Sequence, residues 1–562
     1  MVTRPDAELP RHYGGAFFGA GPRNHPHYTT QVNRMRGLMR NFQFPGRSAV
    51  FATSGMCATS HPLAAKTAID ILQRGGNAAD AALAGAVMLG LCEPHMTGLA
   101  GDCFVLLKPA GKEDVIALNG SGRAPAALSA AALRAQGKTT VPLYGIEAVT
   151  LPGAVDAFCQ LNADWGKMSL SDILAPAIGY AEKGVPVGPR SSADWARITH
   201  LQGVARDFYL IAGQVPQTGT LFRAPGQAEV LRRIAAEGRA GFYEGEVAED
   251  LIDSLNALGG CHSLDDLAAT RCTYSDPVSS LYKGHELVEH APNGQGATAN
   301  LMLNILSHFD LAALDPLGAA RAHLEIEASK LAYDARNRFL ADPDHTRRLD
   351  HMLAPDSAAK LAALIYPGRV CSDPTALSEE VHRDTVYLTV VDSTGMAVSL
   401  IYSLFHGFGS GLASQRFGLL FQNRGAGFNL TEGHPNELNG GKRPMHTIIP
   451  AMLRKNGRVI LPFGVMGGAY QPAGHARFVT NILDHGMDLQ TAIDSPRLFA
   501  EQGVVTLEQA YPDTTLSALE GLGHKVQRAE TPIGGAQAIL MHDAGVLEGA
   551  SDPRKDGCAI GY

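Results

Sequence analysis

Residues 383–400, which read RDTVYLTVVDSTGMAVSL, contain two strand-like stretches joined by a turn. The run from Asp392 to Gly395 consists of residue types that favour a tight connection between antiparallel strands. The stretches on either side of it are apolar enough to predict two buried strands. Thr385 begins the first of them, directly after the acidic Asp384 and far inside the chain. The rest of the sequence decides whether Thr385 is an ordinary strand residue or a buried nucleophile.

The order of the expected elements predicts a layered α+β fold. Pro62 suits the first position of a helix over residues 62–74, and Asn77 suits the cap of a second helix that is apolar nearly all round. The remaining expected elements are strands within 101–119, mainly helix over 160–260, helices from about 297 and over 322–343, strands at 385–392, 396–405, 418–423 and 459–468, and helices near 473–486 and 514–523. This order indicates sheets stacked between helical layers and not a doubly wound dinucleotide fold.

Composition excludes several classes of partner. Lys and Arg number 47 against 55 Asp and Glu, a net charge of -8, and no basic stripe stands out, so nucleic acid is not an expected partner. The longest apolar run, residues 81–92, is too short to span a bilayer, so we expect no membrane partner. Residues 1–50 are rich in Pro, Gly and His, show no secretory signal and predict an irregular arm. The eight cysteines are scattered without a CxxC pair, which favours reduced thiols and a cytoplasmic location.

Common cofactor and nucleophile motifs are missing from the sequence. Residues 407–412, GFGSGL, fail the dinucleotide-binding pattern at their last position, and there is no phosphate-binding loop of the G-x-x-x-x-G-K-[ST] type. No H-E-x-x-H pattern occurs, the 21 histidines show no metal-ligand spacing, and no G-x-S-x-G elbow is present. We therefore expect no metal, no cofactor and no α/β-hydrolase serine.

Several stretches together resemble the γ-glutamyltranspeptidase family of N-terminal nucleophile hydrolases. In chain order they include SHPLAAKTAIDILQRGGNAADAALA, EPHMTGLAGDCF, LPGAVDAF, FYEGEVAEDL, APNGQGATANLMLNIL, KLAYDARNRFLADP and GASDPRKDGCAIGY. The resemblance implies a four-layer αββα sandwich, made as one chain that cuts itself between Asp384 and Thr385. Residues 51–384 would form the large-subunit portion and residues 385–562 the small-subunit portion, and the two would build one domain together.

The implied chemistry explains why a threonine stands at the cut. The Thr385 hydroxyl attacks the preceding carbonyl, and hydrolysis of the resulting ester frees an α-amine whose unperturbed pKa is about 7.7–8.0. That amine then acts as the base for its own hydroxyl, so no separate histidine or aspartate is needed.

The resemblance also implies further members of the catalytic site. It assigns the oxyanion donors to Gly467 and Gly468, at the end of the last expected strand, although a purely structural bend is the alternative. It places Ser403 where the family has a second threonine that contacts the nucleophile, and an ordinary strand serine is the alternative for that position.

The sequence departs from the family pattern where a glutamyl substrate would be held. Ser121 stands at the position of the family's carboxylate-binding arginine, with Arg123 two residues later, and Phe405 and Gly427 replace the two groups that would hold an ammonium. Groups able to bind an anion remain, namely Arg123, Arg424, His446 and Thr447. A buried ammonium without a counter-charge is costly, so the pattern favours the amidohydrolase-like branch, which includes oxamate amidohydrolase and glutaryl-type acylases.

The sequence predicts a small-molecule amide substrate that carries a carboxylate and needs no α-amine. One alternative is a γ-glutamyltransferase or glutathione hydrolase with a rebuilt pocket, and another is an unprocessed relative that only binds a ligand. The choice between hydrolysis and acyl transfer stays open, and a homo-oligomer is compatible with the sequence.

Overall fold

The computed structural model describes residue 43, residues 46–371 and residues 385–562. Asp384 and almost all of the expected arm lie outside the described residues. The last residue of that arm, Val50, already begins the first strand, β1 (Val50–Ala52). The folded unit therefore starts slightly before residue 51.

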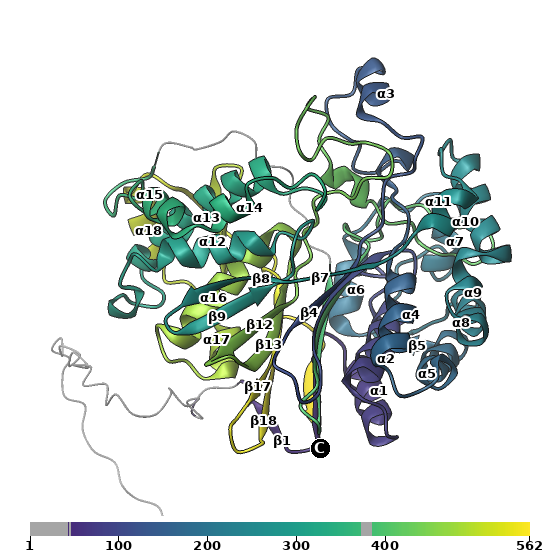
Figure 1. Cartoon of the computed structure of the whole chain (residues 1–562), viewed down its shortest axis with the longest axis horizontal. Helices are drawn as coiled ribbons and strands as arrows, with labels where there is room; N and C mark the ends of the chain where they lie inside the picture. The colour runs from purple at the N-terminus through teal and green to yellow at the C-terminus, as the bar shows by residue number, and fades with distance from the viewer. Residues whose placement is uncertain (1–42, 44–45, 372–384) are drawn as a thin grey trace, which may run out of the picture. The chain divides into compact units, whose positions relative to one another are not determined.

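Two seven-stranded antiparallel sheets form the centre of this unit (Figure 1). The first runs in the order β1, β18 (Leu547–Ser551), β17 (Gly535–Met541), β13 (Arg458–Met466), β12 (Ala451–Lys455), β9 (His285–Glu289) and β8 (Val278–Tyr282). The second runs in the order β19 (Cys558–Gly561), β2 (Gly55–Thr59), β10 (Val386–Asp392), β11 (Ala397–Ser403), β3 (Asp102–Lys108), β4 (Ile116–Gly120) and β7 (Thr273–Ser275). Each sheet takes strands from both sides of residue 385, so neither portion could complete a sheet alone.

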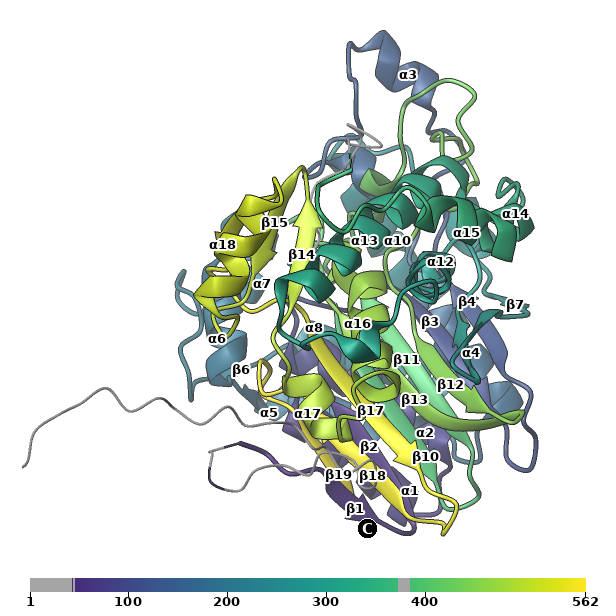
Figure 2. The ribbon, with the colours of Figure 1, turned by 90° about the vertical axis from the view of Figure 1, so that its left-hand side faces the viewer.

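Three apolar clusters make the unit a four-layer αββα sandwich, as the sequence predicts. Residues such as Met56, Leu106, Val288 and Met452 fill the space between the two sheets. Helices α1 (Pro62–Gln73) and α2 (Ala78–Cys92) pack on the outer face of the second sheet. Helices α12 (Gly296–Leu306), α13 (Ala319–Phe339) and α16 (Gln471–Leu483) cover the outer face of the first sheet (Figures 1 and 2).

The two helices at the start of the fold show why the sequence forms them. Pro62 occupies the first turn of α1, and the side chain of His61 accepts a hydrogen bond from the Leu63 amide. Asn77 caps α2 and forms a reciprocal capping box with Asp80. Every residue of α2 is buried, which confirms the expected burial of a helix that is apolar nearly all round.

The remaining elements lie around these four layers. The helices are α3 (Ala130–Ala135), α4 (Ala154–Trp165), α5 (Leu170–Lys183), α6 (Pro189–Ala196), α7 (Val204–Tyr209), α8 (Pro225–Glu237), α9 (Ala240–Tyr243), α10 (Gly245–Ala257), α11 (Leu264–Ala269), α14 (Leu349–Leu353), α15 (Pro355–Ala362), α17 (Leu489–Asp494) and α18 (Asp513–Gly521). The short strands are β5 (Val185–Pro186), β6 (Leu221–Phe222), β14 (Leu498–Glu501), β15 (Val504–Leu507) and β16 (Lys525–Arg528), and the 3-10 helices are η1 (Ile146–Ala148), η2 (Leu311–Ala313), η3 (Arg424–Gly427) and η4 (Gly468–Tyr470). In the described part of the chain, no helix combines the length and the apolar character that crossing a membrane requires.

The predicted strand at 418–423 is wrong. The segment folds back on residues 410–414 as a compact loop, in which the Phe421 amide donates to the Leu412 carbonyl and the Ser414 amide donates to the Leu419 carbonyl. Gly418 has a φ of +66° at the turn, and the pairing after it is limited to one isolated antiparallel bridge between Ala413 and Leu420. The apolar residues of this loop are buried in the helical core, which explains why their pattern resembles that of a strand.

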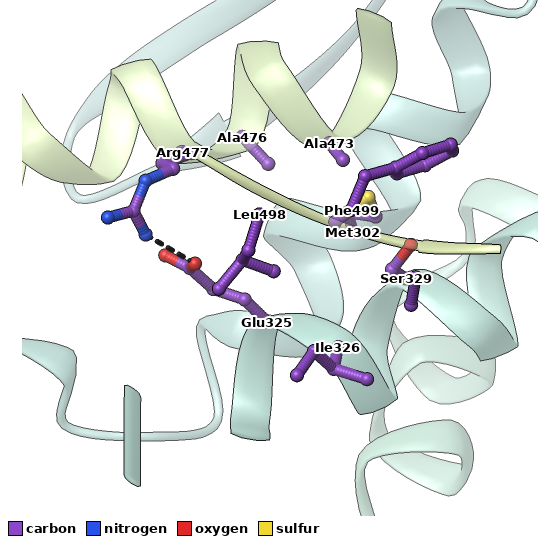
Figure 3. Close-up of a pocket in the computed structure, with 10 residues that line it drawn as sticks. Met302, Glu325, Ile326, Ser329, Ala473, Ala476, Arg477, Leu498 and Phe499 are labelled. Carbon is purple, nitrogen blue, oxygen red and sulfur yellow. Dashed lines mark hydrogen bonds and ion pairs between the residues drawn. The ribbon is translucent and has the colours of Figure 1, made fainter. Parts of the chain in front are cut away.

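A buried ion network joins α13 to α16, and thereby joins the two portions (Figure 3). Glu325 on α13 accepts from the Arg321 Nε at 2.8 Å and from the Arg477 Nη1 of α16 at 2.6 Å. Burial raises the pKa of Glu325, but the two arginines outweigh it and bring the pKa below its usual value. The crevice beside this pair has a volume of only about 10 Å³ and is therefore a packing gap with room for about one water.

Candidate active site

Thr385 and Ser403 lie at the same end of the two central strands of the second sheet. Val386 of β10 pairs with Tyr402 of β11, and the same antiparallel register carried one residue further sets Thr385 opposite Ser403. Thr385 is 2% exposed and Ser403 is fully buried. Directly opposed residues in antiparallel strands lie about 4.5–5.5 Å apart at their Cα atoms, so the two hydroxyl side chains are neighbours.

The glycine turn at the end of β13 lies beside the start of β10. Met466, the residue before the turn, packs in one cluster with Tyr387, two residues after Thr385. Gly467 has a φ of +127° and Gly468 a φ of +56°, conformations that favour glycine. Gly467 caps the 3-10 helix η4 and Gly468 begins it, so their N–H groups precede its internal hydrogen bonds.

Arg424 is a buried cation with unused hydrogen-bonding capacity. Its Nη1 donates to the Thr447 Oγ1 at 3.1 Å, and its guanidinium stacks 4.1 Å from the centre of the Phe405 ring. Its Nε and Nη2 have no hydrogen-bond partner among the described residues. Burial lowers the pKa of Arg424 to about 9, and Asp102 opposes that shift. An anion that reached Nε and Nη2 would meet the side-on fork with which arginine binds a carboxylate.

The side chain of Gln295 connects the Arg424 region to the glycine turn. Its Nε2 donates to the Thr447 carbonyl at 2.7 Å and to the Gly468 carbonyl at 2.9 Å. Its Oε1 accepts from the Arg336 Nη1 at 2.8 Å, which fixes the orientation of the amide. The position of Arg424 relative to Gly468 is therefore set by a fully hydrogen-bonded side chain.

His446 is held inside the protein by its own two nitrogens. Its Nε2 donates to the Asp102 Oδ2 at 3.2 Å, and its Nδ1 accepts from the Ile448 amide at 3.4 Å. Burial lowers the pKa of His446 to about 3, and the neighbouring Arg424 contributes to the shift. The ring is therefore neutral near pH 7, and both of its nitrogens are already used.

Asp102 forms hydrogen bonds to several of the surrounding loops. Its Oδ1 accepts from the Gly122 amide at 2.9 Å, the Gly153 amide at 3.2 Å and the Gln422 Nε2 at 2.9 Å. Asp102 also pairs with Ser403 in the register of β3 and β11. It therefore ties the strand end that carries Ser403 to the loop that carries His446.

The structure separates Arg123 from this arrangement. The Arg123 Nη1 donates to the Gly441 carbonyl at 2.8 Å and forms an ion pair with Asp342 at 3.3 Å. Its side chain is 36% exposed, whereas Arg424 is fully buried. Ser121 is buried, and its Oγ accepts from the Asn293 Nδ2 at 3.0 Å. Of the two arginines, only Arg424 has open donors in a buried setting.

Neither of the two positions where the family holds the substrate ammonium, Phe405 and Gly427, carries a carboxylate. Phe405 is buried with a φ of +88°, and its amide donates to the Ser403 Oγ at 2.8 Å. Gly427 lies in η3, where an added Cβ would come 2.8 Å from the Met445 carbonyl oxygen. The first position thus presents an aromatic face, and the second has no room for a side chain.

A cleft of about 350 Å³ reaches the neighbourhood of the glycine turn. Its lining includes Gly407, two residues after Phe405, and Gly534. A smaller hollow of about 40 Å³ is lined by Gly534 and Gly467, so the two spaces share one wall. An added Cβ on Gly467 would come 3.1 Å from the Gly534 Cα, which keeps this approach narrow.

The family model described as gamma-glutamyltranspeptidase matches residues 64–562. The chain belongs to the gamma-glutamyltranspeptidase family. It is 36% identical to the glutathione hydrolase-like YwrD proenzyme of Bacillus subtilis, over 91% of this chain and 99% of that protein. It is 35% identical to the oxamate amidohydrolase proenzyme of Klebsiella pneumoniae, over 92% of this chain and 100% of that protein. The cephalosporin acylase of Bacillus halodurans has a similar structure, with a TM-score of 0.85 and 37% identity over 93% of this chain and 99% of that one.

Two residues that organise this gamma-glutamyltranspeptidase-family site were missed at the sequence level. Asp102 and Gln295 both lie within family-like stretches, GDCF and NGQG, but neither belongs to a motif that we linked to a function. The available signal was a polar residue inside an otherwise apolar or glycine-rich stretch that the family resemblance already marked. A buried polar group must find partners, so such residues are candidates for organising a site.

Proposed function

We propose that this chain is a self-processing amidohydrolase in which Thr385 is the nucleophile. The observation that carries the proposal is the position of Thr385, opposite Ser403 and beside the Gly467 turn, in a fold whose two portions share both sheets. The names of its relatives support it, since they are proenzymes that include an amidohydrolase.

Self-processing requires only groups that the chain supplies, together with water. The Thr385 Oγ attacks the carbonyl carbon of residue 384, and the amide nitrogen of Thr385 leaves as the new ester forms. Water hydrolyses that ester, which returns the hydroxyl and leaves a carboxylate on residue 384. The freed α-amine lies a few bonds from the hydroxyl whose proton it accepts in later turnovers.

Turnover then follows the same pattern on a substrate amide. The α-amine takes the hydroxyl proton as the Thr385 Oγ attacks the substrate carbonyl, and the N–H groups of Gly467 and Gly468 stabilise the oxyanion. The amine product leaves with a proton, and water releases the acid from the acyl-threonine. Ser403 positions the nucleophile, while Asp102 and Gln295 hold the surrounding loops in place.

The substrate class follows from the buried cation. Nε and Nη2 of Arg424 donate hydrogen bonds to the free carboxylate of a small dicarboxylic acid monoamide, beside Thr447 and the Phe405 ring. No carboxylate replaces the two lost ammonium partners, which opposes a γ-glutamyl donor. Arg123 is engaged with Asp342, and His446 supports the site without touching the substrate carboxylate.

A pair of isosteric variants tests the nucleophile. Thr385→Val removes one buried hydroxyl directly before β10, and Thr389→Val removes another from the middle of that strand. We expect Thr385→Val to stay uncut and inactive on glutaryl p-nitroanilide. Thr389→Val should be cut and active, although it loses side-chain hydrogen bonds to the Val398 carbonyl and to Tyr387. Amidase activity of Thr385→Val would contradict the assignment of Thr385 as the nucleophile.

A further inference from the structure

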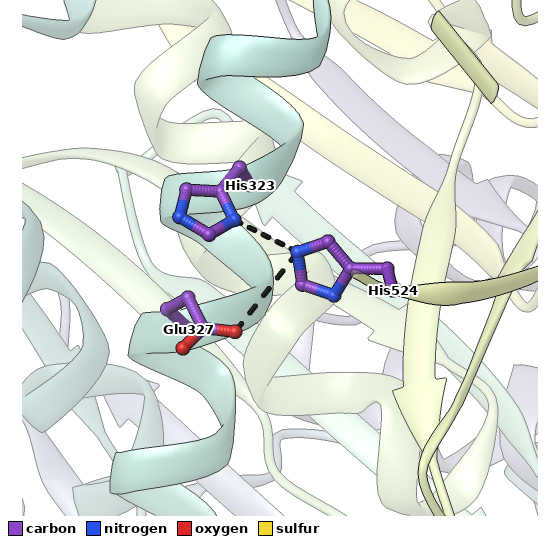
Figure 4. Close-up of side chains that lie close together, drawn as sticks. All are labelled: His323, Glu327 and His524. Carbon is purple, nitrogen blue, oxygen red and sulfur yellow. Dashed lines mark hydrogen bonds and ion pairs between the residues drawn. The ribbon is translucent and has the colours of Figure 1, made fainter. Parts of the chain in front are cut away.

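Three potential metal ligands that are not among the residues of the candidate active site converge on one another (Figure 4). His323 and Glu327 lie one turn apart on α13, and His524 follows α18. The His323 Nδ1 lies 2.8 Å from the His524 Nε2, and that nitrogen lies 4.0 Å from the Glu327 Oε1. All three residues are buried.

The hydrogen bond on the far side of His323 orients its lone pair inward. The His323 Nε2 lies 2.8 Å from the Tyr366 carbonyl oxygen, which only accepts, so this nitrogen carries the proton. In the neutral ring, Nδ1 then presents its lone pair toward His524. A histidine that ligates a metal typically donates its other N–H to a carbonyl or carboxylate in this way.

The carboxylate of Glu327 is positioned from its other side. Its Oε2 accepts from the Cys371 amide at 2.8 Å, and its Oε1 forms an ion pair with Lys330 at 2.8 Å. Lys330 is the partly exposed member of that pair, with 18% of its side chain exposed against 1% for Glu327. A metal ion at Oε1 would compete with Lys330, and the lysine is the group that can turn to solvent.

We propose that His323, Glu327 and His524 bind one divalent transition-metal ion, with zinc the best match. Two imidazoles and a carboxylate suit zinc better than calcium or magnesium, which prefer oxygen ligands. Ligand atoms about 2.0–2.1 Å from a tetrahedral zinc lie about 3.3 Å from one another. The two separations from the His524 Nε2 are 2.8 Å and 4.0 Å, and all three ligand atoms lie within 4.8 Å of one another. The fourth position is left to water. The rival arrangement is a plain hydrogen bond from the His524 Nε2 to the His323 Nδ1.

The location of the cluster gives such an ion a structural role. His323 and Glu327 belong to the portion before residue 385, and His524 belongs to the portion after it. Tyr366 and Cys371 are among the last described residues before residue 385, so the site also contacts the last described part of the first portion. If the chain cuts itself as proposed, the ion links the two products. This role rests on the proposed function, whereas metal binding itself does not.

Zinc titration of the untagged full-length protein tests the site. The chain is stripped with a chelator and titrated with Zn²⁺ against a chromophoric competitor. We expect one tightly bound zinc per chain and at least ~100-fold weaker binding in His524→Gln, since even the loss of a second-shell partner costs 10–100-fold. His308→Gln, on an exposed histidine, is the matched control and should bind as the wild type does.

Lys330→Met gives a change in the opposite direction. Removing the competing ammonium should make zinc bind several-fold more tightly, an effect that general destabilisation does not produce. Anomalous diffraction at the zinc edge should place the ion among the three side chains. No zinc binding by the wild type, unchanged binding in His524→Gln or weaker binding in Lys330→Met would each overturn the site.

The linking role is measured on cut protein and on uncut Thr385→Val. Zinc should raise the urea concentration at which the cut portions separate, and His524→Gln should abolish that increase. Zinc binding to a chain that never cuts would leave the site standing and remove the proposed function. Self-cleavage without zinc binding would do the reverse, so the two failures are distinguishable.

Discussion

Replacement of Arg424 by methionine tests how the site selects its substrate. Arg424 is fully buried, and its Nε and Nη2 form an open side-on fork. Methionine keeps an unbranched apolar stem against Phe405 but has no donor. The substrate carboxylate would then be buried without a partner. We therefore expect KM for carboxylate-bearing amides to rise steeply.

The size of the effect follows from two lost hydrogen bonds to a charged group. Each contributes about 1.5 kcal/mol or more, so the pair contributes about 3 kcal/mol, or ~150-fold in kcat/KM. The matched control is Arg123→Met, on an arginine that already binds Asp342 and the Gly441 carbonyl. That variant should change kcat/KM less than ~3-fold, since a partly exposed ion pair contributes little.

The assay compares glutaryl p-nitroanilide with its methyl ester, which lacks the free carboxylate. The wild type should prefer the acid, and Arg424→Met should lose that preference while cleaving the ester at a similar rate. Self-cleavage of the variant, followed by mass, controls for folding. If Arg123→Met removed the preference and Arg424→Met kept it, the reasoning on the buried fork would be refuted.

Three further perturbations follow from the same structure. The pKa of His446 is about 3, so we expect kcat/KM to increase with pH in a single step, at the α-amine pKa of about 8. A second step between pH 5 and 7 that disappears in His446→Gln would contradict this. Glu325→Gln should destabilise the protein at pH 7 by about 3–5 kcal/mol. Because the folded pKa of Glu325 lies below its unfolded value of about 4.3, its contribution is present above that pH and lost below it, so thermal melting curves of variant and wild type should converge in acid. Gly467→Ala should lower kcat at least ~10-fold with little change in KM, because alanine is strained at a φ of +127° and would shift an oxyanion donor. An unchanged kcat would show that Gly467 is not an oxyanion donor.

Local patterns predicted the elements that depend on local chemistry. Pro62 and Asn77 begin helices because an N-terminal proline and a capping side chain act within a few residues. The strands β10 and β11 follow from their apolar residues and the turn between them. The loop at 418–423 was missed because burial, and not strand pairing, accounts for its apolar residues.

In the candidate site too, some residues could be predicted from local sequence and others could not. Thr385, Ser403, Gly467 and Gly468 were proposed from motifs, and the fold brings them to one end of the facing sheets. The sequence did not distinguish Arg123 from Arg424, because both lie in loops whose side-chain direction depends on distant partners. The internal hydrogen bonds of His446 were equally out of reach, since Asp102 lies 344 residues away in the chain.

The proposed mechanism requires that self-cleavage make Thr385 an N-terminal nucleophile. Intact mass of the purified chain under denaturing conditions tests it most directly. We predict two species, one of 384 residues and one that holds the remaining 178 of the 562 and begins with Thr385. A single uncut species, both in freshly purified protein and after prolonged incubation, would contradict this mechanism, as would a cut at any other bond.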